Sequence, residues 1–174
     1  MTNTLNVSVT SAEYNEVVQW IYAEAELLDA WKEREWLEDM VSEDVVYQVP
    51  LRQTVERARG DGFAEGAYHF DERFGSLETR VARNETEYAW AEDPPSRIRH
   101  HITNIRVSGG DDAFGVSSNL LIFRTHRDAF KPELLSGRRE DLLRRGSDSR
   151  LRLTRRKVFL DATVINTHNM ALFF

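Results

Sequence analysis

The chain has 174 residues, of which 41% are hydrophobic and 30% charged, and its formal net charge is −6. A chain of this length buries roughly 70% of the surface that its unfolded form exposes, so we expect one domain over residues 1–174. The negative charge argues against binding nucleic acid through the overall field. The absence of cysteine excludes disulfides, thiolate nucleophiles and thiolate-bound metal clusters.

Export and membrane insertion have recognisable sequence signals. The N-terminus, MTNTLNVSVTSAEY, lacks the basic start and the apolar run of a secretory signal. No later run approaches the ~20 apolar residues that span a bilayer. We therefore expect a cytoplasmic protein that does not contact a membrane.

The first part of the chain is predicted to be helical. Apolar residues recur at spacings of three and four from Tyr14 to Leu28, and Thr10 with Glu13 forms a plausible capping box. Asp29 is a candidate cap for a second short helix that runs to about Met40. The segment EDVVYQVPL, residues 43–51, then predicts a strand. An extended loop is expected over 52–66, and a third helix over 67–83 with the apolar face Tyr68, Phe74, Leu77 and Val81.

From Arg97 onward the pattern is that of strands. Turn-forming residues at 109–110, 129–132 and 146–148 divide this region. The predicted strands cover about 97–108, 113–126, 132–145, 150–163 and 169–174. Helices followed by a long antiparallel meander predict an α+β fold, in which a curved sheet wraps around the N-terminal helices and encloses a conical cavity. This arrangement is similar to the cone-shaped barrel of nuclear transport factor 2 and ketosteroid isomerase.

A conical cavity can hold acid–base chemistry. A carboxylate whose pKa is raised by apolar surroundings would act there with a tyrosine or histidine, as in a free-standing isomerase or dehydratase. The candidates are Tyr22, Asp39, Asp44, Tyr47 and His100. Acidic residues at a helix end or before a strand are more often caps or solvated, and no spacing singles out a pair. A cone filled by aromatic side chains would argue against this function.

Histidines raise the alternative of a metal site. His126 and Asp128 lie two residues apart on a predicted strand and therefore face the same side, so with the distant His168 they could form a two-histidine, one-carboxylate iron site. The turn that follows them favours a solvent-exposed strand end instead. His100 and His101 are consecutive in a strand, face opposite ways and cannot both bind one ion.

Arginines are dense between residues 138 and 156. Alternation along a strand places Arg150, Arg152 and Arg156 on one face and Leu151 and Leu153 on the other, which predicts a cationic surface over an apolar core. Aromatic residues for base stacking are not interleaved with them, so contact with an acidic protein surface is favoured over RNA. A simple solvated sheet face is the alternative.

One segment carries a family resemblance. Residues 89–107, AWAEDPPSRIRHHITNIRV, closely resemble a segment of the β (small) subunits of bacterial aromatic-ring-hydroxylating dioxygenases, in which a Trp, an acidic residue, Pro-Pro-Ser-Arg and Arg-His precede a strand. The segments GRRED (137–141), RRKVFLDATV (155–164) and ALFF (171–174) follow in the order found in that family. The resemblance covers about the whole chain.

The resemblance implies a division of labour between two chains. A β subunit of this family pairs with a larger α chain, typically as an α3β3 hexamer, and the α chain bears a Rieske [2Fe–2S] cluster and a mononuclear Fe(II). The complex converts an aromatic ring to a cis-dihydrodiol with electrons from NAD(P)H, delivered by a reductase and often a ferredoxin. A Rieske centre needs two cysteines, which this chain lacks. The resemblance thus implies no catalytic residue, cofactor or metal in this chain. It leaves naphthalene, biphenyl, benzoate and benzene types open as substrates and favours the aromatic hydrocarbons among them.

The same segment is predicted to contact the partner. Pro94 and Pro95 fix the backbone before the strand, Trp90 offers a large amphipathic anchor, and Arg97 and Arg99 offer forked donors. The alternative is that Trp90 belongs to the core and the prolines to a rigid turn. Two further arginines complete the predicted interface, Arg138 and Arg139.

Overall fold

A computed structural model describes residues 6–56, 58, 60–86, 92 and 94–174, and one curved sheet dominates it. Within this part of the chain six strands have the order β2-β1-β6-β5-β4-β3. Their bounds are β1 Val41–Arg52, β2 Phe63–Glu72, β3 Arg97–Gly110, β4 Ala113–Thr125, β5 Glu133–Arg145 and β6 Leu151–Leu160. Neighbouring strands are antiparallel except β1 and β6, which are parallel. The α+β class predicted from the sequence is confirmed.

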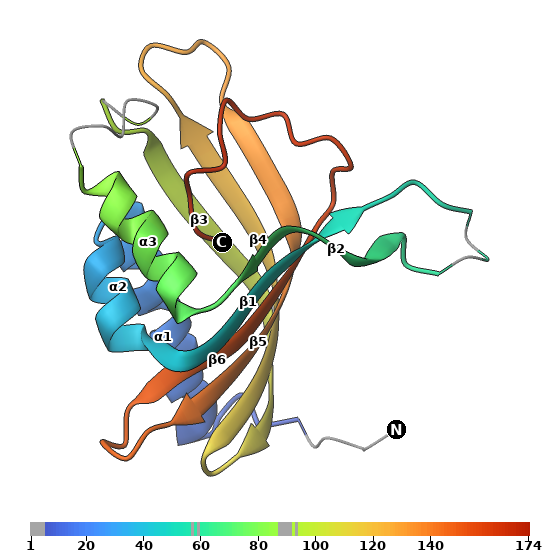
Figure 1. Cartoon of the computed structure of the whole chain (residues 1–174). Coiled ribbons are helices and arrows are strands. Elements are labelled where there is room, and N and C mark those ends of the chain that lie inside the picture. The colour runs from blue at the N-terminus through green and yellow to red at the C-terminus, as the bar shows by residue number, and fades with distance from the viewer. Residues whose placement is uncertain (1–5, 57, 59, 87–91, 93) are drawn as a thin grey trace.

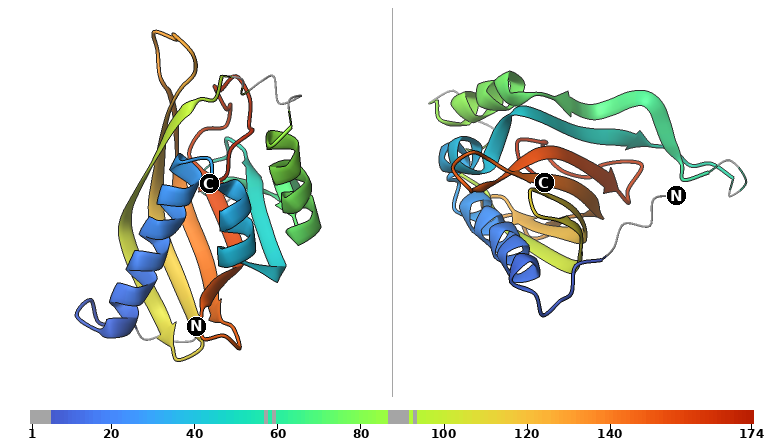
Figure 2. Two further views of the ribbon diagram at one scale, coloured as in Figure 1. Left: turned by 90° about the vertical axis from the view of Figure 1, so that its left-hand side faces the viewer. Right: turned by 90° about the horizontal axis from the view of Figure 1, so that it is seen from below.

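Helices α1 (Ala12–Asp29), α2 (Glu33–Met40) and α3 (Phe74–Asn84) lie on the concave side of the sheet (Figures 1 and 2). We call the space between the sheet and these helices the cone. Helix α1 begins one residue later than the predicted capping box, because Ser11 Oγ accepts the Tyr14 N–H at 3.1 Å. The buried stripe of α1 contains Val17, Ile21 and Leu28, and also Glu24, whose carboxylate therefore points into the cone.

Residues beside β3 cover that edge of the sheet. The Tyr14 hydroxyl donates to the Ile105 carbonyl at 3.3 Å, and the Trp31 indole N–H donates to the Ser96 carbonyl at 2.9 Å. The Asp29 carboxylate accepts the His100 N–H at 2.9 Å. Backbone groups that would otherwise attract another strand are thereby occupied.

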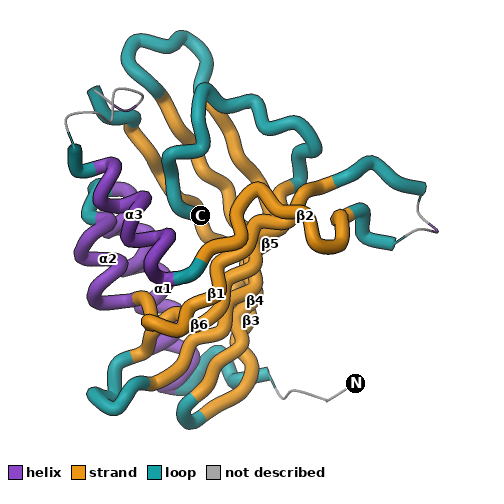
Figure 3. The backbone as a smooth tube through the Cα atoms, viewed as in Figure 1, coloured by secondary structure: helices purple, strands orange, loops and turns teal. Residues whose placement is uncertain are grey.

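The predictions for residues 52–83 and 169–174 were wrong in part. Strand β2 occupies most of what was predicted as the end of a loop and the start of a helix, and Tyr68 pairs with Pro50 of β1. The following helix begins only at Phe74, where Ser76 Oγ accepts the Arg73 N–H. The terminal segment is not a strand, although it is apolar (Figure 3). Side chains inside the cone, those of Tyr47, His100 and Arg156, contact the backbone of residues 173 and 174 within hydrogen-bond distance, where a neighbouring strand would otherwise have paired.

A bulge in β6 overturns the predicted alternation of arginines. Leu153 pairs with Leu143 of β5, whereas Arg155 pairs with the adjacent Leu142, so Thr154 is an extra residue. A shift by one residue exchanges the two faces of a strand. Leu151 and Leu153 face the core as predicted, but Arg156 turns inward and is 0% exposed.

Candidate functional site

The base of the cone holds a cluster of buried ion pairs. Arg156 contacts Glu24 and Asp141, each at 2.8 Å, and Arg139 contacts the same two carboxylates at 3.1 and 3.0 Å. The indole N–H of Trp36 donates to Glu24 at 3.0 Å. We call Glu24, Arg139, Asp141 and Arg156 the ionic cluster; helix α1 and strands β5 and β6 supply its members. Two cations face two anions, so the cluster is electrically balanced.

The ionic cluster is unsuited to proton transfer near neutral pH. Burial acts to raise the pKa of Glu24, but attraction by Arg156 and Arg139 and hydrogen bonds from Arg156 and Trp36 outweigh it and hold this pKa below its usual value. Burial likewise opposes the charge on Arg156, yet Asp141 and Glu24 keep its pKa well above the usual value. A general base works best with a pKa near the working pH. The pKa of Glu24 is instead lowered, away from the range that suits a general base.

Residues 172–174 fill the cone above the ionic cluster. Leu172, Phe173 and Phe174 are all at most 2% exposed. Arg156 donates to the Phe174 carbonyl at 2.6 Å, and the Phe174 N–H donates to the Tyr47 hydroxyl at 2.8 Å. The Phe173 ring lies 4.7 Å from the Trp36 ring, centroid to centroid. Both turned views in Figure 2 place this end of the chain between sheet and helices.

The predicted acid–base residues do not form a site. Tyr47 and His100 do lie in the interior, but both contact the segment after β6, residues 161–174, which we call the tail. Tyr47 Oη donates to the Phe174 carbonyl, and His100 Nε2 is 3.0 Å from the Phe173 carbonyl. Tyr22 is exposed. Asp39 pairs with Arg150 on the surface, and Asp44 accepts a hydrogen bond from Ser42. The sequence showed these residue types but could not show which of them point inward.

A second polar cluster lies where strands β4 and β5 meet the segment that follows β6. We call it the rim cluster; it comprises Glu92, Arg124, His126, Glu133, His168 and Asn169. The guanidinium of Arg124 is fully buried and forms an ion pair with Glu92. It also donates to the Asn169 carbonyl at 3.0 Å. The His168 ring lies 2.8 Å from Glu133 and 3.1 Å from Glu92, nitrogen to oxygen. These contacts tie the segment that precedes residues 172–174 to strands β4 and β5.

The rim cluster brings two predicted metal ligands together and leaves out the third. The rings of His126 and His168 lie 4.3 Å apart, centroid to centroid. Asp128 is exposed at the start of the next turn, and the carboxylate beside the two rings is that of Glu92. Glu92 comes from the segment before β3, and no periodicity in the sequence marked it.

The predicted interface residues divide between surface and interior. Pro94, Pro95, Arg97, Arg99 and Arg138 are exposed, whereas Trp90 lies outside the described residues. The side chain of Arg139 is 1% exposed and belongs to the ionic cluster, so the alternation of β5 turns it away from any surface.

Apolar side chains lie beside these arginines on the convex face of the sheet. Arg99 pairs across the strands with Phe123, and Phe123 with Leu134. Leu121, Phe123 and Leu134 are exposed to 40%, 38% and 59%. We call this surface the outer face; it comprises Arg97, Arg99, Leu121, Phe123, Leu134 and Arg138. Its mixture of forked cations and apolar side chains is typical of protein interfaces.

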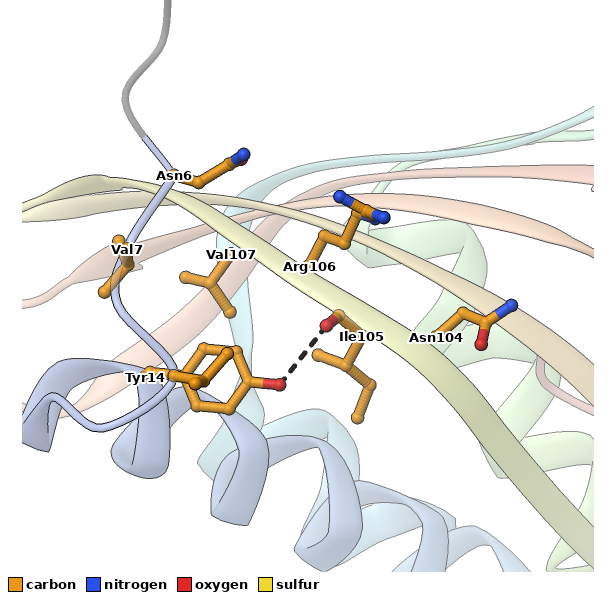
Figure 4. A pocket seen from close by; sticks show the side chains of 8 residues that line it. Asn6, Val7, Tyr14, Asn104, Ile105, Arg106 and Val107 are labelled. Carbon is orange, nitrogen blue, oxygen red and sulfur yellow. Dashed lines mark hydrogen bonds between the residues drawn. The ribbon is translucent and has the colours of Figure 1, made fainter.

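A hollow of about 530 Å³ lies outside the cone, where the N-terminal segment crosses β3 (Figure 4). Val7, Tyr14, Ile105 and Val107 line it, and the hydrogen bond from Tyr14 to the Ile105 carbonyl crosses its floor. The bulge of β3 opens it, with Asn104 at φ 53°. Its lining also includes the polar residues Asn6, Asn104 and Arg106 and carries no acid–base pair.

A cleft between α2, α3 and Pro95 contains a carboxyl group with an unusual pKa. Burial raises the pKa of Glu33 to about 7, although Asn84 donates a hydrogen bond to it. In the unfolded chain the same group titrates near 4.5. Between these two values the folded chain binds more protons, so the stability that protonated Glu33 provides is lost as the pH rises from about 4.5 through 7.

Replacing Glu33 by glutamine is expected to remove this pH dependence. Above pH 7 the free energy of unfolding of Glu33→Gln should exceed that of the unmodified chain by up to about 3 kcal/mol, and the difference should vanish below pH 4.5. Urea denaturation at a series of pH values measures this. Glu35→Gln, on the same helix and exposed, is the matched control. A constant difference across the pH range would contradict the assignment.

Comparison with known proteins identifies a matching family and similar solved structures. A family model described as "ring hydroxylating beta subunit" matches residues 23–167. A structure of naphthalene 1,2-dioxygenase with indole bound in its active site is 25% identical, with a TM-score of 0.84, over 98% of this chain and 90% of that chain. The β subunit of benzoate 1,2-dioxygenase from Burkholderia mallei is 20% identical, with a TM-score of 0.70, over 87% and 93%.

The fold is also shared by proteins of other descriptions. A candidate scytalone dehydratase from Novosphingobium aromaticivorans has a TM-score of 0.63 at 15% identity, over 92% of this chain and 91% of that one. At this identity the likeness concerns the fold alone. Among the described helices, none is both long and apolar enough to cross a bilayer.

Proposed function

This chain belongs to the family of ring-hydroxylating β subunits, and we propose that it is the non-catalytic small subunit of an aromatic-ring dioxygenase. The observation that carries the non-catalytic role is the filled cone. Phe173 and Phe174 occupy the space in which a cone-shaped enzyme would bind its substrate, and the carboxylates beneath them are neutralised by Arg139 and Arg156. A substrate would have to displace both the tail and its hydrogen bonds.

The oxygen chemistry is assigned to a larger α chain. The proposed partner carries the Rieske [2Fe–2S] cluster and the mononuclear Fe(II), and three copies of each chain form an α3β3 hexamer. A reductase, with or without a ferredoxin, delivers electrons from NAD(P)H. The lack of cysteine in this chain supports that division, because a Rieske cluster needs two thiolates.

The proposed reaction is the cis-dihydroxylation of an aromatic hydrocarbon in the cytoplasm. The similarity to naphthalene 1,2-dioxygenase, at 25% identity over 98% of this chain, favours a hydrocarbon of naphthalene type over a carboxylated ring. The benzoate 1,2-dioxygenase β subunit is less similar in both identity and TM-score. The substrate pocket itself belongs to the α chain in this proposal.

The outer face, extended by Pro94 and Pro95, is the proposed contact with the α chain. The prolines border a hollow together with Arg97 and Asp128. Arg97 is held in place by hydrogen bonds to Thr125 Oγ1 at 3.1 Å and to the Arg127 carbonyl at 2.9 Å. A guanidinium that is ordered before binding loses less entropy when it meets a carboxylate.

Arg97→Ala is expected to weaken assembly more than folding. Arg97 is exposed, so its loss should change the free energy of unfolding by about 0.5 kcal/mol or less, whereas loss of an interface anchor costs more than about 1 kcal/mol of binding. Sedimentation of the purified complex at decreasing concentration measures assembly. Arg106→Ala, on the same strand but far from the prolines, is the matched control. If Arg97→Ala assembles as the unmodified chain does, Arg97 does not contribute to the interface.

Turnover assays test the non-catalytic role. This chain alone, the α chain alone and their mixture are each supplied with reductase, NADH and naphthalene, and dihydrodiol formation is followed. The proposal predicts no product from this chain alone and product whenever the α chain is present and folded. Ligand binding or isomerase activity by this chain alone would support the other cone-fold function instead.

A further inference from the structure

We propose that Glu92, His126 and His168 form a binding site for a divalent first-row transition metal ion, with Zn²⁺ as its simplest occupant. One potential ligand atom from each residue lies within 4.8 Å of those of the other two. The three residues come from separate parts of the chain: the segment before β3, the residue that follows β4 and the tail after β6.

The donor set fits such an ion. Two imidazoles and one carboxylate are common ligands of Zn²⁺ and its neighbours, with bonds of about 2.0–2.2 Å. Ligand atoms around a tetrahedral ion of that size lie about 3.4 Å apart. The side chains therefore need to approach one another by about an ångström. His126 is half-buried and His168 partly exposed, so an ion can reach both rings from solvent.

Outer contacts already orient both rings. His168 Nδ1 lies 2.8 Å from Glu133 Oε1, which also accepts the backbone N–H of His168 at 2.9 Å. Ser96 Oγ lies 3.1 Å from His126 Nδ1. Metal-binding histidines commonly donate their second ring N–H to a carboxylate in this way, and the contact fixes which nitrogen is free to bind.

His168 Nε2 faces a Glu92 oxygen that also accepts hydrogen bonds from Arg124 and Asn169. If His168 Nδ1–H donates to Glu133, the lone pair of Nε2 faces a Glu92 oxygen at 3.1 Å. Two acceptors at that distance repel each other unless a proton or a metal ion lies between them. A metal ion would satisfy both at once.

Arg124 is the competitor for this position. Its Nη2 group contacts Glu92 and lies 3.2 Å from His168 Nε2. Two carboxylates, Glu92 and Glu133, face two guanidinium groups, Arg124 and Arg127, so the charge around the site is balanced before an ion binds. When the ion binds Glu92, Arg124 keeps the Asn169 carbonyl at 3.0 Å. The ion would thus fasten the tail to the rim of the cone.

Metal titration of the full-length chain tests the proposal. The chain, without an affinity tag, is dialysed against a chelator and titrated with ZnCl₂ in a calorimeter, and CoCl₂ is used to record ligand-field absorption. We expect one ion per chain, a rise in melting temperature on adding Zn²⁺, and an affinity at least about tenfold lower for His126→Gln and His168→Gln. His101→Gln, which alters an exposed histidine of β3, should bind as the unmodified chain does.

Two outcomes would overturn the proposal. One is the absence of saturable Zn²⁺ binding by the unmodified chain. The other is equal binding by the unmodified chain and His126→Gln. His126 lies at the rim and is only half-buried, so this variant decides the matter even if His168→Gln fails to fold. Neither result depends on the proposed dioxygenase function, because no turnover is measured.

Discussion

Replacing Arg156 by alanine is expected to lower the free energy of unfolding by about 3–5 kcal/mol, because it leaves buried carboxylates without their main partner. Arg156 is 0% exposed and contacts both Glu24 and Asp141 at 2.8 Å. It also donates to the Phe174 carbonyl, so its loss frees the tail as well. Urea denaturation, followed by circular dichroism, measures the change.

Arg155→Ala is the matched control for this prediction. Arg155 is the preceding residue of β6 and is exposed. Its replacement should change stability by about 0.5 kcal/mol or less. In Arg156→Ala two buried carboxylates share Arg139 as their one remaining cation and should have raised pKa values in the folded chain, so the deficit should be smaller at low pH than at pH 8. Equal stabilities of the two variants would mean that β6 lacks the bulge described here.

Phe174→Ala is expected to cost about 3–5 kcal/mol, the usual range for removing a fully buried phenylalanine ring. Phe174 is 0% exposed, and its ring lies 6.5 Å from that of Phe70, centroid to centroid. The backbone hydrogen bonds to Tyr47 and Arg156 can persist, so the variant should fold around a cavity. Thermal denaturation measures the loss, with Phe130→Ala, at a 98% exposed position, as control.

The cavity left by Phe174→Ala provides a second readout. An apolar cavity of this kind stays dry and can bind a small aromatic molecule. Benzene should therefore raise the melting temperature of Phe174→Ala and leave that of Phe130→Ala unchanged. If Phe174→Ala is as stable as Phe130→Ala, the tail does not fill the cone, and the argument against a substrate site there fails.

Much of the fold could be predicted from local pattern. Strands β3 to β6 follow an alternation of apolar and polar residues between segments of turn-forming residues, and their predicted bounds agree closely with the observed ones, except at the end of β6. The periodicity of α1 was equally clear. Strand β2 was missed because it exists through pairing with β1, and spacing within residues 63–72 does not reveal that partner.

The interior of the cone could not be predicted in the same way. A single extra residue at Thr154 decides whether Arg156 faces solvent or core, and alternation alone gives the wrong answer. Glu24, the partner of Arg156, lies 132 positions earlier. Buried charges persist only where such distant partners meet. For the same reason the sequence offered Asp128 as a third ligand beside His126 and His168, whereas the fold supplies Glu92.

The native mass and iron content of the complex that co-purifies with this chain would establish whether it is the small subunit of a dioxygenase. The chain is tagged and recovered from its source cells, and light scattering and elemental analysis are applied to the eluted complex. We expect a hexamer that contains this chain and a larger iron-bearing chain in equal numbers. A small, iron-free homo-oligomer would contradict it and would return attention to the cone as a site in its own right.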